Sequence, residues 1–193
     1  MNILNVGYDS ANYYLLEGQA GRLLIDVGWP GTLGKLLAAL KRKGAALNQI
    51  SALLVTHYHP DHAGLAQELK DRGVQLVVLG TQRAAIPELR RHIKPSYPYR
   101  EISLNGNVDL TPDESRDWLR RVGVDGEIIG TPGHSADSVT LILDEGAAFT
   151  GDLTRLEMAT DEARREVELS WEKIRARRAK TIYPGHGPVW RLE

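Results

Sequence analysis

Residues 51–66 read SALLVTHYHPDHAGLA, and this stretch carries a structural pattern and a chemical one. Its apolar run, Leu53-Leu54-Val55, is typical of a buried strand. His57, His59 and Asp61 follow two positions apart, so their side chains point the same way if the chain stays extended. From Asp61 the apolar spacing becomes helical, which places His62 in the first turn of a helix and turns it in another direction. The stretch therefore predicts a strand, a turn rich in metal-binding side chains, and a helix.

Three further candidates for metal ligands lie far along the chain in similar settings. His134 ends the run TPGH, Asp152 follows Gly151, and His186 lies within PGHG. Each comes directly after a predicted strand, where a rigid sheet fixes the start of a loop and the loop supplies reach. The adjacent glycines permit close approach of the backbone. We expect these side chains to join the first group in one site.

Composition limits what such a site can be. The chain has no cysteine, so metal ligands must be nitrogen or oxygen atoms of His, Asp and Glu. Its 193 residues are 42% hydrophobic and 25% charged, which predicts one globular domain over residues 1–193. The 24 basic and 25 acidic side chains give a net charge of −1, which does not favour nucleic acid as a partner. The N-terminal residues indicate neither a signal peptide nor a membrane span, so we expect a cytoplasmic protein without a membrane partner.

Short apolar runs alternate with amphipathic stretches, which predicts an α/β fold. The expected strands are 3–6, 13–16, 23–26, 52–56, 75–79, 127–129, 139–143, 147–150 and 180–183. The expected helices are 34–43, 63–72, 84–92, 112–122 and 161–178. In the last of these, the run of arginine and glutamate from Arg155 to Arg178 predicts an outer helix with paired charges.

Five motifs in this order resemble those of the metallo-β-lactamase-fold hydrolases. They are LIDVG at 24–28, THYHPDH at 56–62, Gly133-His134, TGD at 150–152 and PGHG at 184–187. The resemblance implies a four-layer αβ/βα sandwich, in which two mixed β-sheets are flanked by helices and the site lies along one edge. Within that group the chain resembles the core of glyoxalase II and lactonase-type enzymes, without a C-terminal helical domain.

The resemblance also implies a ligand set for two divalent metal ions. His57, His59 and His134 would hold the first ion, Asp61, His62 and His186 the second, and Asp152 would bridge them. Zinc is the expected metal, with iron and manganese left open by the ligand types. Two such ions roughly 3.5–4 Å apart can lower the pKa of a shared water from about 15.7 toward neutrality and present hydroxide as a nucleophile. Asp61 would also orient that hydroxide and act as the catalytic proton carrier.

The remaining interpretations concern the surroundings of the site. Asp26, at the end of a strand, either accepts the far N–H of a ligand histidine or is an ordinary turn residue. His92 is expected to face solvent. The segment Arg83–Arg100 carries five cationic side chains against Glu88 alone, and is either a wall for an anionic small-molecule substrate or a solvated helix face.

Three functions stay open at this point. The first is a binuclear hydrolase of a small ester, thioester or lactone. The second is an oxidoreductase that resembles persulfide dioxygenases, with one iron held by His57, His134 and Asp152. The third is a non-catalytic binding or regulatory protein that keeps the fold. The sequence determines neither the substrate nor the oligomeric state.

Overall fold

The N-terminal half of the chain forms a mixed sheet of six strands that neighbour one another in sequence order. In the computed structural model, which describes residues 1–192, these are β1 (Asn2–Asn5), β2 (Tyr14–Glu17), β3 (Arg22–Ile25), β4 (Ile50–Leu54), β5 (Gln75–Leu79) and β6 (Val108–Leu110). The first three strands form an antiparallel meander, and β3 to β6 run parallel. Parallel neighbours end at the same edge, so the loops after β3 and β4 lie side by side.

The C-terminal half forms a second mixed sheet, in the order β11-β10-β9-β8-β7. Its strands are β7 (Gly126–Gly130), β8 (Val139–Leu143), β9 (Ala147–Gly151), β10 (Thr181–Pro184) and β11 (Trp190–Arg191). Only β9 and β10 are parallel, which again brings the loops after two strands to one edge.

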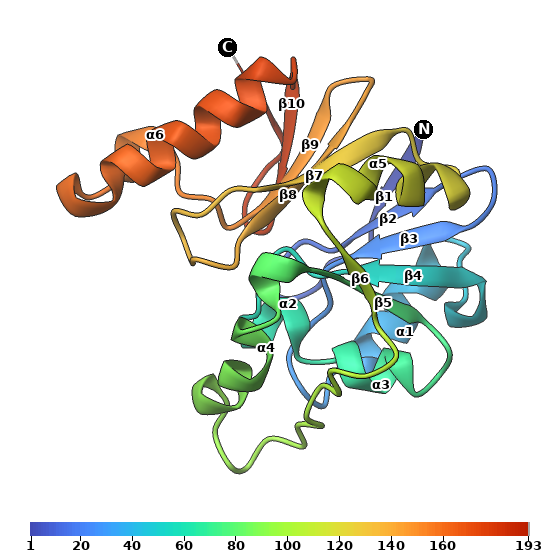
Figure 1. The fold of residues 1–193 in the computed structure, drawn as a ribbon. Coiled ribbons are helices and arrows are strands. Elements are labelled where there is room, and N and C mark those ends of the chain that lie inside the picture. Colours follow the sequence, from blue (N-terminus) through green and yellow to red (C-terminus); the bar gives the residue numbers. More distant parts are fainter. Residues whose placement is uncertain (193) are drawn as a thin grey trace.

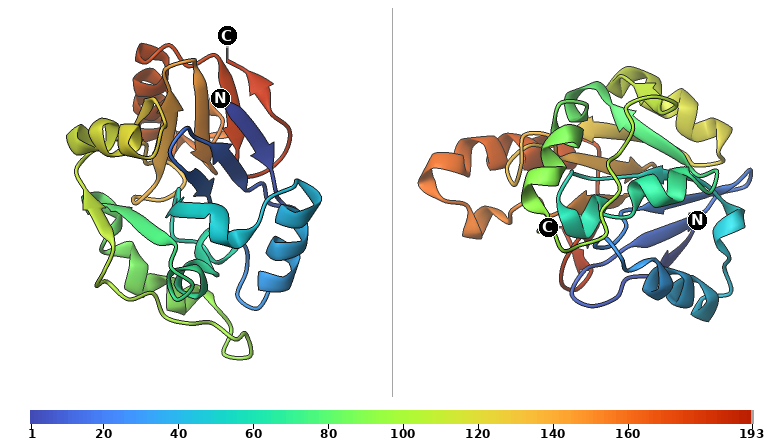
Figure 2. Two further views of the ribbon diagram at one scale, coloured as in Figure 1. Left: turned by 90° about the vertical axis from the view of Figure 1, so that its right-hand side faces the viewer. Right: turned by 90° about the horizontal axis from the view of Figure 1, so that it is seen from below.

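Helices cover the outer faces of both sheets (Figures 1 and 2). The α-helices are α1 (Leu33–Arg42), α2 (Pro60–Ala63), α3 (Ala66–Lys70), α4 (Ala85–Glu88), α5 (Pro112–Arg121) and α6 (Asp161–Ala176). Short 3₁₀ helices are η1 (Leu47–Gln49), η2 (Gly80–Gln82), η3 (Leu89–His92) and η4 (Leu156–Met158). Helices α1 to α3 pack on the first sheet and α6 on the second, while α5 contacts β6 and β7 where the two sheets meet.

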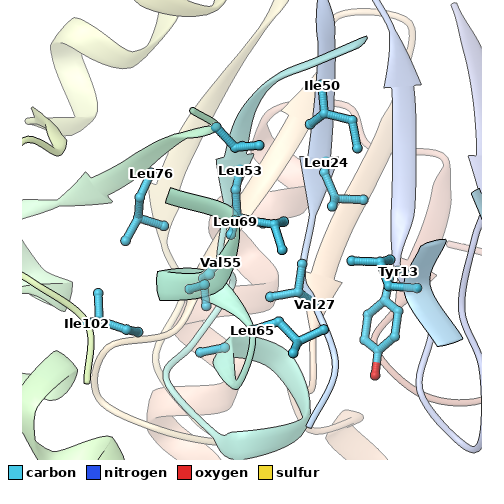
Figure 3. Packing of buried hydrophobic residues seen from close by; sticks show 14 of the residues in the cluster. Tyr13, Leu24, Val27, Ile50, Leu53, Val55, Leu65, Leu69, Leu76 and Ile102 are labelled. Carbon is cyan, nitrogen blue, oxygen red and sulfur yellow. The ribbon is translucent and has the colours of Figure 1, made fainter. Parts of the chain in front are cut away.

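Alternation along the strands explains the layers. In β4, Leu53 faces the helical side and packs with Leu24, Leu76 and Leu69, as Figure 3 shows. Its neighbours Ala52 and Leu54 face the second sheet. A third cluster joins α6 to the outer face of the second sheet. The four-layer sandwich of two mixed sheets flanked by helices is thereby confirmed.

The predicted helix over 63–72 begins earlier and is interrupted. It starts at Pro60, whose fixed φ suits a first helical position, and divides into α2 and α3 around Gly64. A Cβ at Gly64 would lie 2.4 Å from Cδ of Pro30, because the chain after β3 crosses this helix closely. The predicted helix over 84–92 becomes α4 followed by the 3₁₀ turn η3.

Two strands escape sequence reasoning, β6 and β11. They are three and two residues long. Each forms by hydrogen bonding to a longer neighbouring strand, β6 to β5 and β11 to β10. Among residues 1–192, none of the helices is both long and apolar enough to span a membrane.

Candidate metal centre

The loops that follow β3, β4, β7, β9 and β10 meet at one edge of the sandwich, beside α2 (Figure 1). Every candidate ligand named from the sequence lies in one of these loops or in α2. The structure brings all seven together in three overlapping groups of three, within each of which the ligand atoms lie within 4.8 Å of one another. The first group is His57, His59 and His134, and the second is Asp61, His62 and His186. The third, His57, His62 and Asp152, joins the other two.

The first group consists of three imidazoles whose ring nitrogens converge. Nδ1 of His59 lies 3.2 Å from Nε2 of His57 and 3.0 Å from Nε2 of His134. Burial lowers the pKa of His57 well below its usual value, and the charge of His62 lowers it further. Burial and His134 also lower the pKa of His59. Neutral imidazoles with their lone pairs directed at a common point suit a cation.

The second group combines one carboxylate with two imidazoles. Oδ2 of Asp61 lies 3.2 Å from Nε2 of His186 and 3.6 Å from Nε2 of His62. The two histidine nitrogens are 3.4 Å apart. His62 is fully buried, whereas Asp61 and His186 are reached by solvent, so this group opens to the surface.

Asp152 lies between the two groups. Its Oδ2 atom lies 3.9 Å from Nε2 of His57, 3.7 Å from Nε2 of His134 and 3.4 Å from Nε2 of His186. Its Oδ1 atom lies 3.3 Å from Nε2 of His62. Its Oδ1 atom is buried yet completes no hydrogen bond within residues 1–192. Burial would raise the pKa of Asp152, but the neighbouring histidines, His62 first, outweigh burial and hold the pKa below its usual range. A buried carboxylate oxygen without a donor, surrounded by imidazole nitrogens, fits a site built for cations.

Asp26 supports the centre from behind. It accepts hydrogen bonds from the backbone N–H of Thr56 (2.7 Å), from the Thr56 hydroxyl (2.8 Å) and from Nδ1 of His62 (2.9 Å). The bond from Nδ1 leaves Nε2 of His62 facing the centre without a proton when the ring is neutral. Burial lowers the pKa of His62, but the carboxylates of Asp26 and Asp152 outweigh it and raise the pKa to about 10, so a cation that binds Nε2 displaces a proton.

Two glycines make room for these side chains. A Cβ on Gly185 would lie 2.4 Å from Oδ1 of Asp152, and one on Gly151 would lie 2.4 Å from Oγ1 of Thr56. Gly151 also has a φ of +53°, which disfavours other residues. The close approach expected from the glycine-containing motifs is therefore a steric requirement here.

Sequence reasoning missed the residues that hold the loop of His186. The Ser10 carbonyl accepts a 2.7 Å hydrogen bond from Nδ1 of His186. The backbone N–H of Asn12 donates to the Gly185 carbonyl (2.7 Å), and its side-chain amide donates to the carbonyls of Pro184 (3.0 Å) and Gly187 (2.8 Å). Nothing in the local sequence around Asn12 signals this role, because its partners lie more than 170 residues away.

The segment Arg83–Arg100 reaches the rim of the site at His92. His92 is exposed as expected, but its ring centroid also lies 5.7 Å from that of His59. Three of the five cations of this segment are held in ion pairs, Arg83 with Asp109, Arg91 with Glu88 and Arg100 with Asp71. These pairings give the segment the character of a solvated face with partnered charges.

The chain matches the family model described as "Metallo-beta-lactamase superfamily" over residues 6–186. It is 32% identical over 181 residues to "Beta-lactamase-like protein 2 homolog" of Caenorhabditis elegans, a match that covers 92% of this chain and 56% of that protein. It is 29% identical over 199 residues to "Probable metallo-hydrolase MJ0888" of Methanocaldococcus jannaschii, covering 95% of this chain and 90% of that one. "Hydroxyacylglutathione hydrolase" of Xanthomonas axonopodis pv. citri is 28% identical over 146 residues, which are 75% of this chain and 47% of that one.

Solved structures show the same fold. The metallo-beta-lactamase family protein TTHA1429 of Thermus thermophilus superposes with a TM-score of 0.75 at 19% identity, over 98% of this chain and 74% of that one. The BLEG-1 B3 metallo-beta-lactamase superposes with a TM-score of 0.72 at 22% identity, over 98% of this chain and 93% of that one. The chain spans little more than half the length of its two animal relatives, 56% of the nematode protein and 59% of the Drosophila melanogaster protein. With its fold, its cluster of histidines and aspartates and a family match over nearly its whole length, the chain belongs to the metallo-beta-lactamase superfamily.

Proposed function

We propose that the chain is a binuclear metal-dependent hydrolase that cleaves a small ester, thioester or lactone. The observation that carries this proposal is the position of Asp152, whose carboxylate lies within 4 Å of imidazole nitrogens from both ligand groups. A carboxylate in that position suits a bridge between two cations, and a single ion would leave one group of donors without use.

The ligand assignment follows the two outer groups. His57, His59 and His134 would hold one ion, Asp61, His62 and His186 the other, and Asp152 would be shared. We propose zinc, which accepts nitrogen and oxygen ligands in open catalytic sites. Bound there, two divalent ions supply Lewis acidity and lower the pKa of water, which makes hydroxide available near neutral pH.

The side chains of the centre have distinct tasks in such a reaction. Asp61 is half-buried at the open side, where its carboxylate can orient the attacking water and accept its proton. The hydrogen bond from His62 to Asp26 holds the His62 ring in one orientation and one tautomer. Asp61 and Asp152 supply only two negative charges, so a pair of divalent ions leaves positive charge to stabilise the oxyanion that forms at the attacked carbonyl.

The names of the relatives favour carbonyl substrates. Besides the hydroxyacylglutathione hydrolase, the chain is 31% identical over 195 residues to "Atrochrysone carboxyl ACP thioesterase" of Aspergillus fumigatus, over 51% of that protein. Both names refer to thioester cleavage, and both proteins are about twice as long as the matched region. The ester, thioester or lactone bond is therefore the class we propose for this chain.

Elemental analysis of protein purified without added metal or chelator tests the proposal. We expect about two zinc ions per chain, and about one in His186→Ala, which loses a ligand of the second group. His92→Ala is the matched control, since His92 lies at the rim outside all three groups and its removal should leave two ions bound.

The other outcomes separate the alternative functions. About one iron per chain with oxygen consumption would point to dioxygenase chemistry. Two bound ions without hydrolysis of any ester, thioester or lactone would point to a binding or regulatory protein. Protein that takes up no metal after reconstitution would refute the ligand assignment itself.

A further inference from the structure

The metal centre opens on its C-terminal side into a cleft made of two adjoining hollows. The first, of about 340 Å³, begins at His134, Asp152 and His186 and extends to Trp171 and Trp190. The second, of about 370 Å³, shares both tryptophans and continues outward between η4, α6 and β11. A molecule that reached from one hollow into the other would have one end beside the metal ligands and the other end near the surface.

The wall of the first hollow is mainly apolar and well fixed. Trp171 is buried, and its indole N–H donates a 2.9 Å hydrogen bond to the Thr154 carbonyl. Its ring centroid lies 5.6 Å from that of Trp190. Leu153 and Ile182 complete the inner wall, and Met158, 73% exposed, lies at its mouth. Such a wall suits the hydrocarbon part of a substrate, since burying apolar surface is favourable and rigid aromatic rings lose little entropy.

Of the residues 1–192 that the structure describes, three arginines, Arg155, Arg175 and Arg191, and one acid, Glu157, border the second hollow. Within residues 1–192 none of these arginines forms an ion pair. Arg155 instead lies over the ring of Trp190, with its Cζ atom 4.8 Å from the ring centroid. Stacking of this kind holds a guanidinium in place and leaves its N–H groups free.

Other arginines in the run from Arg155 to Arg178 do form ion pairs. Arg164 and Arg165 pair with Glu168, and Arg177 pairs with Glu127. Paired charges along an outer helix were expected from the sequence, and these three follow that expectation. Arg155 and Arg175, which border the cleft, depart from it. The outer end of the cleft therefore carries cations that form no ion pair within residues 1–192, whereas Lys173 and Arg178, which are also without ion pairs there, lie outside both hollows.

We propose that the substrate is an amphipathic anion whose ester or thioester bond lies at the metal centre and whose apolar body crosses the two tryptophans. Its far end carries a carboxylate or a phosphate-type group that binds Arg155, with Arg175 and Arg191 contributing charge. This inference rests on the proposed hydrolase function and names its substrate class. Guanidinium groups recognise both kinds of oxyanion, so the chemistry of the end group is left to the experiment.

The test compares aryl esters that differ in charge, using metal-loaded protein. Phenyl butyrate is neutral, 4-carboxyphenyl butyrate and 4-(phosphonomethyl)phenyl butyrate carry the anion on the leaving group, and monophenyl glutarate carries it on the acyl group. We expect at least one anionic ester to be preferred over phenyl butyrate by about tenfold in kcat/KM, as one charge-assisted hydrogen bond allows. The preferred ester identifies which end group the cleft takes and which side of the bond faces it.

Substitutions assign that preference to the cleft. Arg155→Gln should remove the preference, so that kcat/KM becomes equal for anionic and neutral esters. Arg155→Lys should restore part of the preference. Arg165→Gln, in α6 and away from both hollows, should keep the wild-type ratio. An unchanged ratio in Arg155→Gln would overturn the inference while leaving the hydrolase function intact.

If no ester is cleaved, the proposed function is refuted, and a binding measurement then tests the subsite by itself. Calorimetry with 4-phenylbutylphosphonate and 4-phenylbutan-1-ol should then show about tenfold tighter binding of the anion to the wild type and to Arg165→Gln. Equal affinity of the phosphonate for the wild type and Arg155→Gln would overturn the subsite as well.

Discussion

Asp26→Asn is the substitution that most directly tests how the second group of ligands is held. The Oδ2 atom of Asp26 accepts from both Nδ1 of His62 (2.9 Å) and the Thr56 hydroxyl (2.8 Å), while Oδ1 accepts from the Thr56 N–H (2.7 Å). Asparagine can keep the last bond, but an NH₂ group then replaces Oδ2. The backbone is not at issue, because Asp26 has a φ of +62° and asparagine tolerates that region equally well.

The Thr56 hydroxyl can rotate and accept from the new NH₂ group, but the N–H of His62 cannot. Either two donors face each other in a buried place, or the ring moves its proton to Nε2. Since Nε2 is the atom that faces Asp61, Asp152 and His186, the second result blocks the ligand atom directly. We expect a loss of about 1–3 kcal/mol in the free energy of unfolding from the unsatisfied donor. We also expect about 10–100-fold weaker binding of one metal ion, the usual effect of losing such a supporting partner.

Two assays measure these effects, competition for zinc with a chromophoric chelator and urea unfolding of the metal-free protein. Ser115→Ala is the control, because Ser115 is buried in α5, outside the ligand groups, and its hydroxyl accepts a 3.0 Å hydrogen bond from the Ile128 N–H. It should lose stability and keep both metal affinities. If Asp26→Asn binds two ions as tightly as the wild type, the argument that Asp26 selects the tautomer of His62 is wrong.

Three further outcomes follow from the geometry of the centre. Chelation should lower the free energy of unfolding by about 2.7 kcal/mol per site when free metal had been 100 times its Kd, and an unchanged urea midpoint would contradict metal binding by the native state. Gly185→Ala places a Cβ 2.4 Å from Oδ1 of Asp152 and should weaken metal binding, whereas Gly34→Ala, in α1 with nothing within 4 Å, should keep it and raise stability by about 0.5–1 kcal/mol in unfolding titrations. Asn12→Ala removes the side-chain donor to the Pro184 and Gly187 carbonyls. The same zinc competition should then show about tenfold weaker binding of one ion. An equal loss of affinity for both ions would argue against a local effect on the His186 loop.

The sequence by itself determined an α/β fold and the residues of the cluster, and the resemblance of its motifs to a known family implied the layers of the sandwich. Strands such as 75–79 and 139–143 were predicted with their observed bounds, because strands buried on both faces appear in sequence as short, nearly continuous apolar runs. The seven ligand candidates were named from short motifs, because each motif places a His or Asp next to a strand end and beside a small residue. These properties are local, so they can be predicted from the neighbouring residues in the sequence.

Only the tertiary structure decided how the cluster is supported and what lies around it. The bonds from Asn12 to the His186 loop, the three donors around Asp26 and the cleft between α6 and β11 all join residues far apart in sequence. The same holds for β6 and β11, which are too short to show a period and form only where a neighbouring strand presents unpaired backbone groups. From the sequence, Arg83–Arg100 has an excess of cations and Arg155–Arg178 has paired charges, but packing reverses part of this expectation. Within residues 1–192, Arg83, Arg91 and Arg100 are ion-paired, whereas Arg155 and Arg175 form no ion pair at the cleft. Which charges are free to bind a ligand depends on distances across the folded chain, and no local pattern encodes them.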